Sequence, residues 1–158
     1  MKQNKLRIFD TVKTQITMSV LFKLLLLIVL NTSFANAQES SNCNITVNIS
    51  GLDSNKGKLL VGLYDSKNTF LDKRFQSVIG EISEKTGQVV FKNVPKGVYA
   101  ISFIHDENDN GKMDTNFLGI PKEDYGCSNN ARGTMGPPKW KDAKFELNTT
   151  NKIIDITL

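Results

Sequence analysis

Apolar and polar residues alternate along most of the chain beyond its first 42 residues, in short runs that end at turn residues. In residues 43–50, Ile45, Val47 and Ile49 fall on one face and polar side chains fall on the other, which predicts a half-buried β-strand. Residues 58–65 carry apolar side chains on both faces, so we expect this strand in the centre of a sheet. No helical periodicity is visible in this part of the chain.

Further strands are predicted wherever apolar runs are bounded by turn residues, at 75–83, 88–94, 98–105, 143–147 and 154–158. Short strands with regular turns are typical of two packed sheets. The sequence therefore predicts an all-β fold, a two-sheet antiparallel sandwich of about seven strands, transthyretin-like or immunoglobulin-like.

Residues 106–141 interrupt this pattern with five glycines and three prolines. The segment also contains Phe117, Leu118, Tyr125 and Trp140, which are too apolar for a solvated linker. We therefore expect one long ordered loop, packed over an end or an edge of the sandwich. Long irregular segments in compact domains usually serve a function, so this loop is where a site is expected.

The first 37 residues have the pattern of a cleaved signal peptide. Lys23 precedes the apolar run 24–30, and Ala35-Asn36-Ala37 offers a small-residue cleavage motif. Met18 is an alternative start that would make the leader more compact. A membrane anchor is the competing interpretation, but the apolar run is far shorter than the roughly 20 residues that span a bilayer.

The expected organisation is a leader at 1–37, a disordered polar lead-in at 38–42 and a single domain at 43–158. Five of the 20 basic residues and one of the 16 acidic residues lie in the leader, so the remaining chain carries 15 of each. A chain with equal numbers of basic and acidic residues gives no sign of the positively charged surface that nucleic-acid binding needs. We expect an exported protein without a stable membrane span after cleavage, in the periplasm, on the cell surface or outside the cell.

Two cysteines, Cys43 and Cys127, follow the leader. An even number of cysteines in an exported protein favours a disulfide, which here would tie the first strand to the long loop. Two unpaired thiols are the alternative. A lipid-modified Cys43 is disfavoured, because an apolar residue is missing three positions before it.

The sharpest local feature is an acidic and asparagine-rich loop that begins at Asp106. Its oxygen-bearing side chains occupy positions 1, 3, 5 and 9 of a calcium loop of the EF-hand type, with glycine at position 6. Calcium prefers six to eight oxygen ligands, which alternate residues of a tightly wound loop can supply. The predicted ligands are Asp106, Asn108, Asn110, the Lys112 carbonyl and Asp114.

The match to a calcium loop is incomplete, because Phe117 stands where a bidentate glutamate is expected and neither flank is helical. Glu123 or Asp124 could fold back as the missing carboxylate, and the affinity would then be weak. The alternative is a turn without an ion, since Asp, Asn and Gly also favour turns held by their own side chains. The sequence leaves both interpretations open.

Support for catalysis is thin. His105 is the only histidine and is expected to be structural, hydrogen-bonding into the adjoining loop. Ser128 lies outside any nucleophile motif. A small hydrolase using the loop carboxylates is an alternative, but nothing in the sequence fixes the separation of those groups. We therefore expect a protein that is not an enzyme.

The ordered string from Phe91 to Asp114, followed by the segments 119–123 and 125–130, resembles the bacterial domain-of-unknown-function family 2141. The resemblance spans about residues 43–158 and implies an exported domain. The segment 93–99 is also similar to the turn-strand unit of transthyretin-like and carboxypeptidase-regulatory-like sandwiches, which implies architecture alone.

These observations lead to one expected function and two alternatives. We expect a non-catalytic binding or accessory module of the cell envelope, with calcium as a stabilising ion and Tyr125 and Trp140 as contact aromatics. Its ligand would be a glycan, a small molecule or another protein of the envelope. The alternatives are a purely structural envelope protein, in which the long loop only covers a sheet edge, and the small hydrolase.

Overall fold

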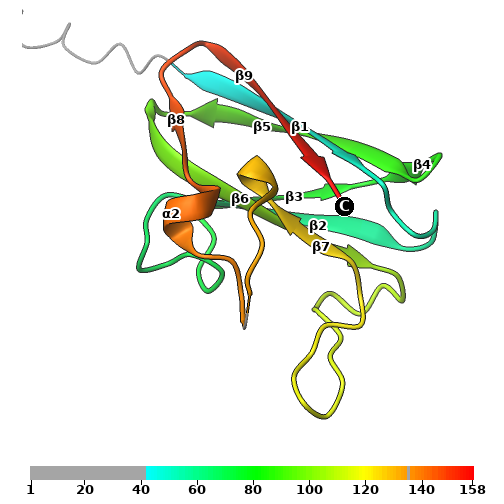
Figure 1. Cartoon of the computed structure of the whole chain (residues 1–158). Coiled ribbons are helices and arrows are strands. Elements are labelled where there is room, and N and C mark those ends of the chain that lie inside the picture. Colours follow the sequence, from blue (N-terminus) through cyan, green and yellow to red (C-terminus); the bar gives the residue numbers. More distant parts are fainter. Residues whose placement is uncertain (1–41, 135) are drawn as a thin grey trace, which may run out of the picture. The chain divides into compact units, whose positions relative to one another are not determined.

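The computed structural model describes residues 42–134 and 136–158, and strands dominate this part of the chain (Figure 1). The predicted leader and nearly all of the predicted lead-in lie outside the described residues. No helix in the described ranges is long and apolar enough to cross a membrane.

The first sheet has the strand order β4-β5-β1-β9. Its members are β1 (Cys43–Ser50), β4 (Ile82–Ser83), β5 (Thr86–Val94) and β9 (Asn151–Thr157). The second sheet has the order β3-β2-β6-β7, and β8 pairs with the beginning of β6. Its members are β2 (Lys58–Tyr64), β3 (Gln76–Gly80), β6 (Gly97–Asp106), β7 (Tyr125–Cys127) and β8 (Phe145–Leu147).

The predicted all-β sandwich of two sheets is confirmed, but the expectation of wholly antiparallel sheets is wrong at one strand pair. β1 and β9 run parallel, in register from Asn44 opposite Asn151 to Ser50 opposite Thr157. The two strands also interact through side chains on their outward face, where the Asn48 amide donates to the Asp155 carboxylate at 2.8 Å. Alternation of side chains fixes which face of a strand is buried but not the direction in which the strand runs.

The core lies between the sheets and uses the faces that alternation predicts. Ile45, Val47 and Ile49 of β1 are buried, as are the inward residues Leu59, Val61 and Leu63 of β2. Strand β2 lies between β3 and β6, so its predicted central position is also confirmed.

The outer face of the second sheet is covered over part of its area. There Phe70, Leu71 and Trp140 pack on a small cluster that contains Ala100 and Cys127. These covering residues come from the segment after β2 and from the short helix α2 (Trp140–Ala143). The part of this face nearer to Ile104 is less covered, and Ile104 is half-buried.

The long segment 106–141 is more regular than its composition predicts. It contains β7, which adds to the edge of β6, the short 3-10 helix η1 (Ser128–Asn130) and the beginning of α2. Between β6 and β7 the chain projects away from the sheets, as the yellow-green to yellow ribbon shows (Figure 1). The segment thus leaves the sheet at Asp106, returns to it at Tyr125 and continues along its edge.

Candidate functional site

The acidic loop begins at the last residue of β6, where Asp106 is only 2 % exposed. Its carboxylate accepts main-chain hydrogen bonds from Asn110 at 3.0 Å and from Gly111 at 2.8 Å. Gly111 has a φ of 80°, a conformation that costs glycine little and other residues more. The Asp106 carboxylate therefore holds the turn together through two main-chain N–H groups, and Gly111 permits its tight bend.

Two asparagine amides join the two sides of the loop. The Nδ2 atoms of Asn108 and Asn110 donate to the Asp114 carboxylate at 2.6 and 2.9 Å. Their Oδ1 atoms accept main-chain N–H groups at 3.1 and 3.0 Å, from Asn110 and Lys112 respectively. This is the side-chain-to-backbone pairing that gives Asp and Asn their preference for turns.

Glu123 folds back against the loop and is 8 % exposed. Its Oε1 accepts the main-chain N–H of Glu107 at 3.1 Å, and its Oε2 accepts that of Asp114 at 2.9 Å. The Lys122 N–H also donates to the Asp114 carbonyl at 2.8 Å. One buried carboxylate thus fastens both ends of the loop to the segment that leads into β7.

The fit of the loop to calcium can be judged from its donor set. Asp106, Asn108, Asn110 and Asp114 lie on one turn, and Glu123 is the one predicted side-chain ligand outside it. Within residues 42–134 and 136–158, no three His, Cys, Asp or Glu side chains are grouped so that they could hold a metal. Calcium would therefore depend on the Asn108 and Asn110 oxygens, and their amide nitrogens now face Asp114. Calcium binding stays a prediction.

His105 is fully buried next to the loop. Its Nε2 lies 2.8 Å from the Lys56 carbonyl and must donate there, because a carbonyl oxygen can only accept. Its Nδ1 lies 3.7 Å from Asp124 Oδ2 and has no hydrogen-bond partner in the described structure. His105 thus ties the turn before β2 to the base of the loop.

Ser128 is also fully buried and is occupied by main-chain groups. Its Oγ accepts the Ile101 N–H at 2.9 Å and donates to the Ala143 carbonyl at 2.6 Å. This hydroxyl holds η1 and the end of α2 against β6, which is a structural role.

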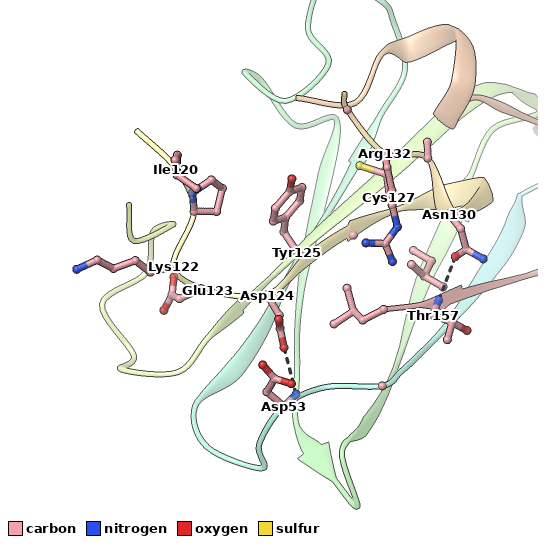
Figure 2. Close-up of a pocket in the computed structure, with 17 residues that line it drawn as sticks. Asp53, Ile120, Lys122, Glu123, Asp124, Tyr125, Cys127, Asn130, Arg132 and Thr157 are labelled. Atoms are coloured by element: carbon pink, nitrogen blue, oxygen red, sulfur yellow. Dashed lines mark hydrogen bonds between the residues drawn. The ribbon is translucent and has the colours of Figure 1, made fainter. Parts of the chain in front are cut away.

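A hollow of about 650 Å³ lies beside β7 and reaches the end of β9 (Figure 2). Asp53 and Asp124 meet on one side of it, where the Asp53 N–H donates to Asp124 Oδ2 at 3.1 Å. On the other side the Arg132 side chain points into the hollow near Asn130, whose Oδ1 accepts the Thr157 N–H at 3.0 Å. Lys122 and Glu123 also line it, so charged side chains of both signs surround this polar space.

A second hollow of about 620 Å³ lies on the outer face of the second sheet and shares Ile120, Pro121 and Tyr125 with the first. Tyr125 is 36 % exposed and lines both hollows. Trp140 lines neither hollow and instead packs edge-on against Phe70, with ring centroids 5.7 Å apart. The structure thus separates the two predicted contact aromatics.

Sequence reasoning missed the two arginines at these hollows, Arg74 and Arg132. Neither belongs to a motif, and each lies in an irregular segment whose path no periodicity predicts. They become visible only when the fold brings them to β2 and β7.

The predicted disulfide is not formed in the part of the chain that the structure describes. Cys43 packs into the main core from β1 of the first sheet. Cys127 packs on the outer side of the second sheet with Ala100, Ala131 and Ala143. The two cysteines therefore belong to different layers, a separation that cysteine spacing in the sequence cannot reveal. Burial raises the pKa of the Cys127 thiol to about 11, and a hydrogen bond with Ser102 offsets part of this rise.

These features define an all-β sandwich domain that carries one long ordered segment over a sheet edge. The chain belongs to the family described as "Uncharacterized protein conserved in bacteria (DUF2141)", whose model matches residues 47–155, from β1 into β9. The predicted family resemblance is thus confirmed. No curated protein and no solved structure matches the sequence, so the likeness to transthyretin-like sandwiches stays a prediction.

Proposed function

We propose that the protein is an exported, non-catalytic binding module of the bacterial cell envelope, whose binding surface is carried by segment 106–141 and stabilised by calcium. The observation that carries this proposal is that Tyr125 lines two hollows whose walls come largely from that segment. Concave surfaces with an aromatic side chain and a few polar groups are the usual setting of small-ligand sites. Surface loops fixed on a rigid scaffold are the usual carriers of binding residues.

Buried carboxylates hold segment 106–141 in place. This ordering supports a binding role for the segment rather than a role that only covers the sheet edge. Asp106 and Glu123 are buried carboxylates, and each accepts two main-chain N–H groups. Buried charges are costly unless they are hydrogen-bonded, and here four main-chain N–H groups meet that need and fix the shape of the segment. A segment that only covered an edge would need no such ordering.

Calcium is the ion that the loop chemistry favours. The predicted ligands are Asp106, Asn108, Asn110, the Lys112 carbonyl, Asp114 and Glu123, all of which offer oxygen. Binding would replace the two amide contacts to Asp114, so we expect a dissociation constant of about 10⁻⁴–10⁻³ M, as in extracellular calcium modules.

The absence of catalysis is proposed because the candidate catalytic groups serve the fold. Ser128 and His105 are fully buried and bond main-chain groups. The Asp106 and Glu123 carboxylates are likewise occupied by main-chain N–H groups. Glu123 lines the first hollow, but no described histidine or serine there could serve as its partner in hydrolysis, because His105 and Ser128 are held by main-chain groups.

Chemical-shift mapping tests the binding role. The ¹⁵N-labelled protein is titrated with three panels, of envelope glycan fragments, small amphiphiles and short peptides. The proposal predicts saturable shifts clustered around Tyr125 for at least one panel, lost in Tyr125→Ala and kept in Ile153→Ala, an exposed apolar residue on the first sheet. If no panel produced chemical-shift changes clustered around Tyr125, the result would contradict the binding role and favour a purely structural protein.

Thermal melting tests the calcium role. At about 10 mM calcium, roughly 100 times the tightest expected dissociation constant, the native state gains about 2.7 kcal/mol, which raises the melting temperature by several degrees. Asp114→Asn should remove this rise. Asp109→Asn should keep it, because Asp109 is exposed, pairs with Lys58 at 3.1 Å and occupies no ligand position. An unchanged melting temperature in the parent protein would remove calcium from the proposal.

A further inference from the structure

The second hollow has a floor made by three adjacent strands of the second sheet. Gly62, Ser102 and Cys127 lie side by side in register on β2, β6 and β7, and Ile104 lies beside Tyr125 in the next row. Their neighbours in sequence, such as Val61 and Phe103, point into the core, so these residues point outward. The floor is therefore the outward face of these strands, where Ser102 and Ile104 are half-buried.

Two loops form the walls of this groove. One wall is residues 118–121, at the tip of the excursion between β6 and β7, where Leu118 is 69 % and Ile120 is 55 % exposed. The opposite wall comes from residues after η1, including Pro137 and Pro138, and Leu71 closes part of the rim. The lining is thus mainly apolar and open to solvent.

The turn that carries Leu118 is held by hydrogen bonds to Asn116. The Asn116 side chain accepts the main-chain N–H groups of Leu118 at 2.9 Å and Ile120 at 3.0 Å. The Asn116 N–H donates to the Ile120 carbonyl at 2.9 Å, and the Asn116 carbonyl accepts the Gly119 N–H at 2.9 Å. The apolar side chains are therefore presented by an ordered turn.

Arg74 supplies the positive charge of the groove. Its Cγ and Cδ atoms lie over Gly62, only 3.1 Å from where a β-carbon on Gly62 would stand, so the missing side chain makes room for the arginine. The Tyr64 hydroxyl also lies 3.1 Å from that position, so Arg74 and Tyr64 are neighbours over Gly62. No carboxylate in residues 42–134 and 136–158 lies within ion-pair distance of Arg74. A guanidinium placed beside an apolar groove in this way is complementary to a planar anion.

We propose that this groove binds a small apolar carboxylate, with Arg74 and Tyr64 taking the carboxylate and Leu118, Ile120 and Pro137 taking the apolar part. The inference rests on the proposed binding function and names the ligand class of one of its two hollows. A volume of about 620 Å³ suits a ligand with a chain or ring of this kind. Arginine binds carboxylates through two parallel N–H groups, while Tyr64 can donate a third hydrogen bond.

Calorimetric titration with a matched pair of probes, octanoate and octan-1-ol, tests this directly on the protein purified from the full chain. The two probes share an apolar tail and differ in the carboxylate. We expect octanoate to bind about tenfold more tightly than the alcohol, as one charge-assisted hydrogen bond would give. Arg74→Gln should abolish that difference. Arg132→Gln, which changes the arginine of the other hollow, should keep it.

The apolar walls are tested with a second matched pair of variants. Leu118→Ser should weaken both probes, because Leu118 lines the groove. Phe117→Ser should weaken neither, since Phe117 is 94 % exposed and does not line the groove. The side chains changed in these four variants are all exposed, so the variants are expected to fold.

Three outcomes would overturn the inference, and they bear differently on the proposed function. Equal affinity for both probes, with sensitivity to Leu118→Ser, would refute the carboxylate and leave a binding groove. Binding of neither probe would refute the groove, while the shift map with glycans and peptides would still decide the binding role. Association with phospholipid vesicles only, lost in Phe117→Ser, would assign the apolar tip to a membrane surface instead.

Discussion

Glu123 accepts the main-chain N–H of Asp114 at 2.9 Å, across the whole excursion that carries the apolar tip. Its other oxygen accepts the Glu107 N–H at 3.1 Å, so one buried side chain closes the excursion at its base. Replacing Glu123 by Gln removes the charge and one acceptor oxygen. We expect the free energy of unfolding to fall by about 1–3 kcal/mol, measured by urea denaturation.

The matched control for this variant is Glu146→Gln, which changes an exposed glutamate on β8. Surface substitutions away from special contacts usually stay within about 0.5 kcal/mol. If both variants lost the same stability, the Glu123 carboxylate would not be the closing element.

Ser128 provides a second prediction, about the edge on which the long segment rests. In Ser128→Ala the buried Ile101 N–H loses its acceptor and the Ala143 carbonyl loses its donor. An unsatisfied buried main-chain group costs about 1–3 kcal/mol, so the unfolding midpoint in urea should fall clearly. Ser77→Ala, on the exposed face of β3, should leave the midpoint nearly unchanged. A stable Ser128→Ala protein would mean that the segment is held by apolar packing alone.

Cys127 should resist alkylation in the folded protein. Its thiol is buried, and with a pKa of about 11 only about one molecule in a thousand carries the reactive thiolate near pH 8. Iodoacetamide labelling followed by mass spectrometry should find Cys127 unmodified in buffer and modified in denaturant, without added reductant. Protection that persists in denaturant until a reductant is added would show that Cys127 is in a disulfide after all.

The same thiol predicts how stability depends on pH at the alkaline end. The folded state holds the Cys127 proton to a pKa of about 11, while an unfolded thiol releases it near its ordinary value of 9.0. Unfolding then releases a proton, so the stability present below pH 9 is lost as the pH rises towards 11. The loss from this group is about 2–3 kcal/mol. Burial also raises the pKa values of Tyr64 and Tyr99 above 10.0, which adds to the loss in the same direction.

Cys127→Ala isolates the contribution of the thiol. Denaturation curves at intervals between pH 8 and 11 should show a shallower decline for this variant than for the parent protein. Parallel curves for the two proteins would assign the alkaline loss to the tyrosines.

Much of the sandwich could be predicted from the sequence, because burial of one strand face leaves a period of two. Strand β1 alternates along its whole length, and β1, β2 and β6 all lie where they were expected. β7 was missed, since Tyr-Gly-Cys is too short to show a period. The parallel course of β9 was missed because alternation is the same in either direction.

The site was predicted less completely than the fold. The acidic loop could be located because Asp, Asn and Gly at fixed spacing favour turns and ion sites, whereas the returning carboxylate was left open between Glu123 and Asp124. Arg74 and Tyr125 could not be brought together from the sequence. They line the same hollow only because β2, β6 and β7 are neighbours in one sheet, a long-range pairing that no local pattern encodes.

The binding surface is proposed to be stabilised by calcium in the loop from Asp106 to Asp114, and a crystal structure of the protein soaked in calcium tests this most directly. The account predicts an ion at about 2.3–2.6 Å from oxygens of Asp106, Asn108, Asn110 and Asp114, with both asparagine amides turned from their present contacts. A loop that keeps its Asn108 and Asn110 hydrogen bonds to Asp114, with no ion among them, would contradict it.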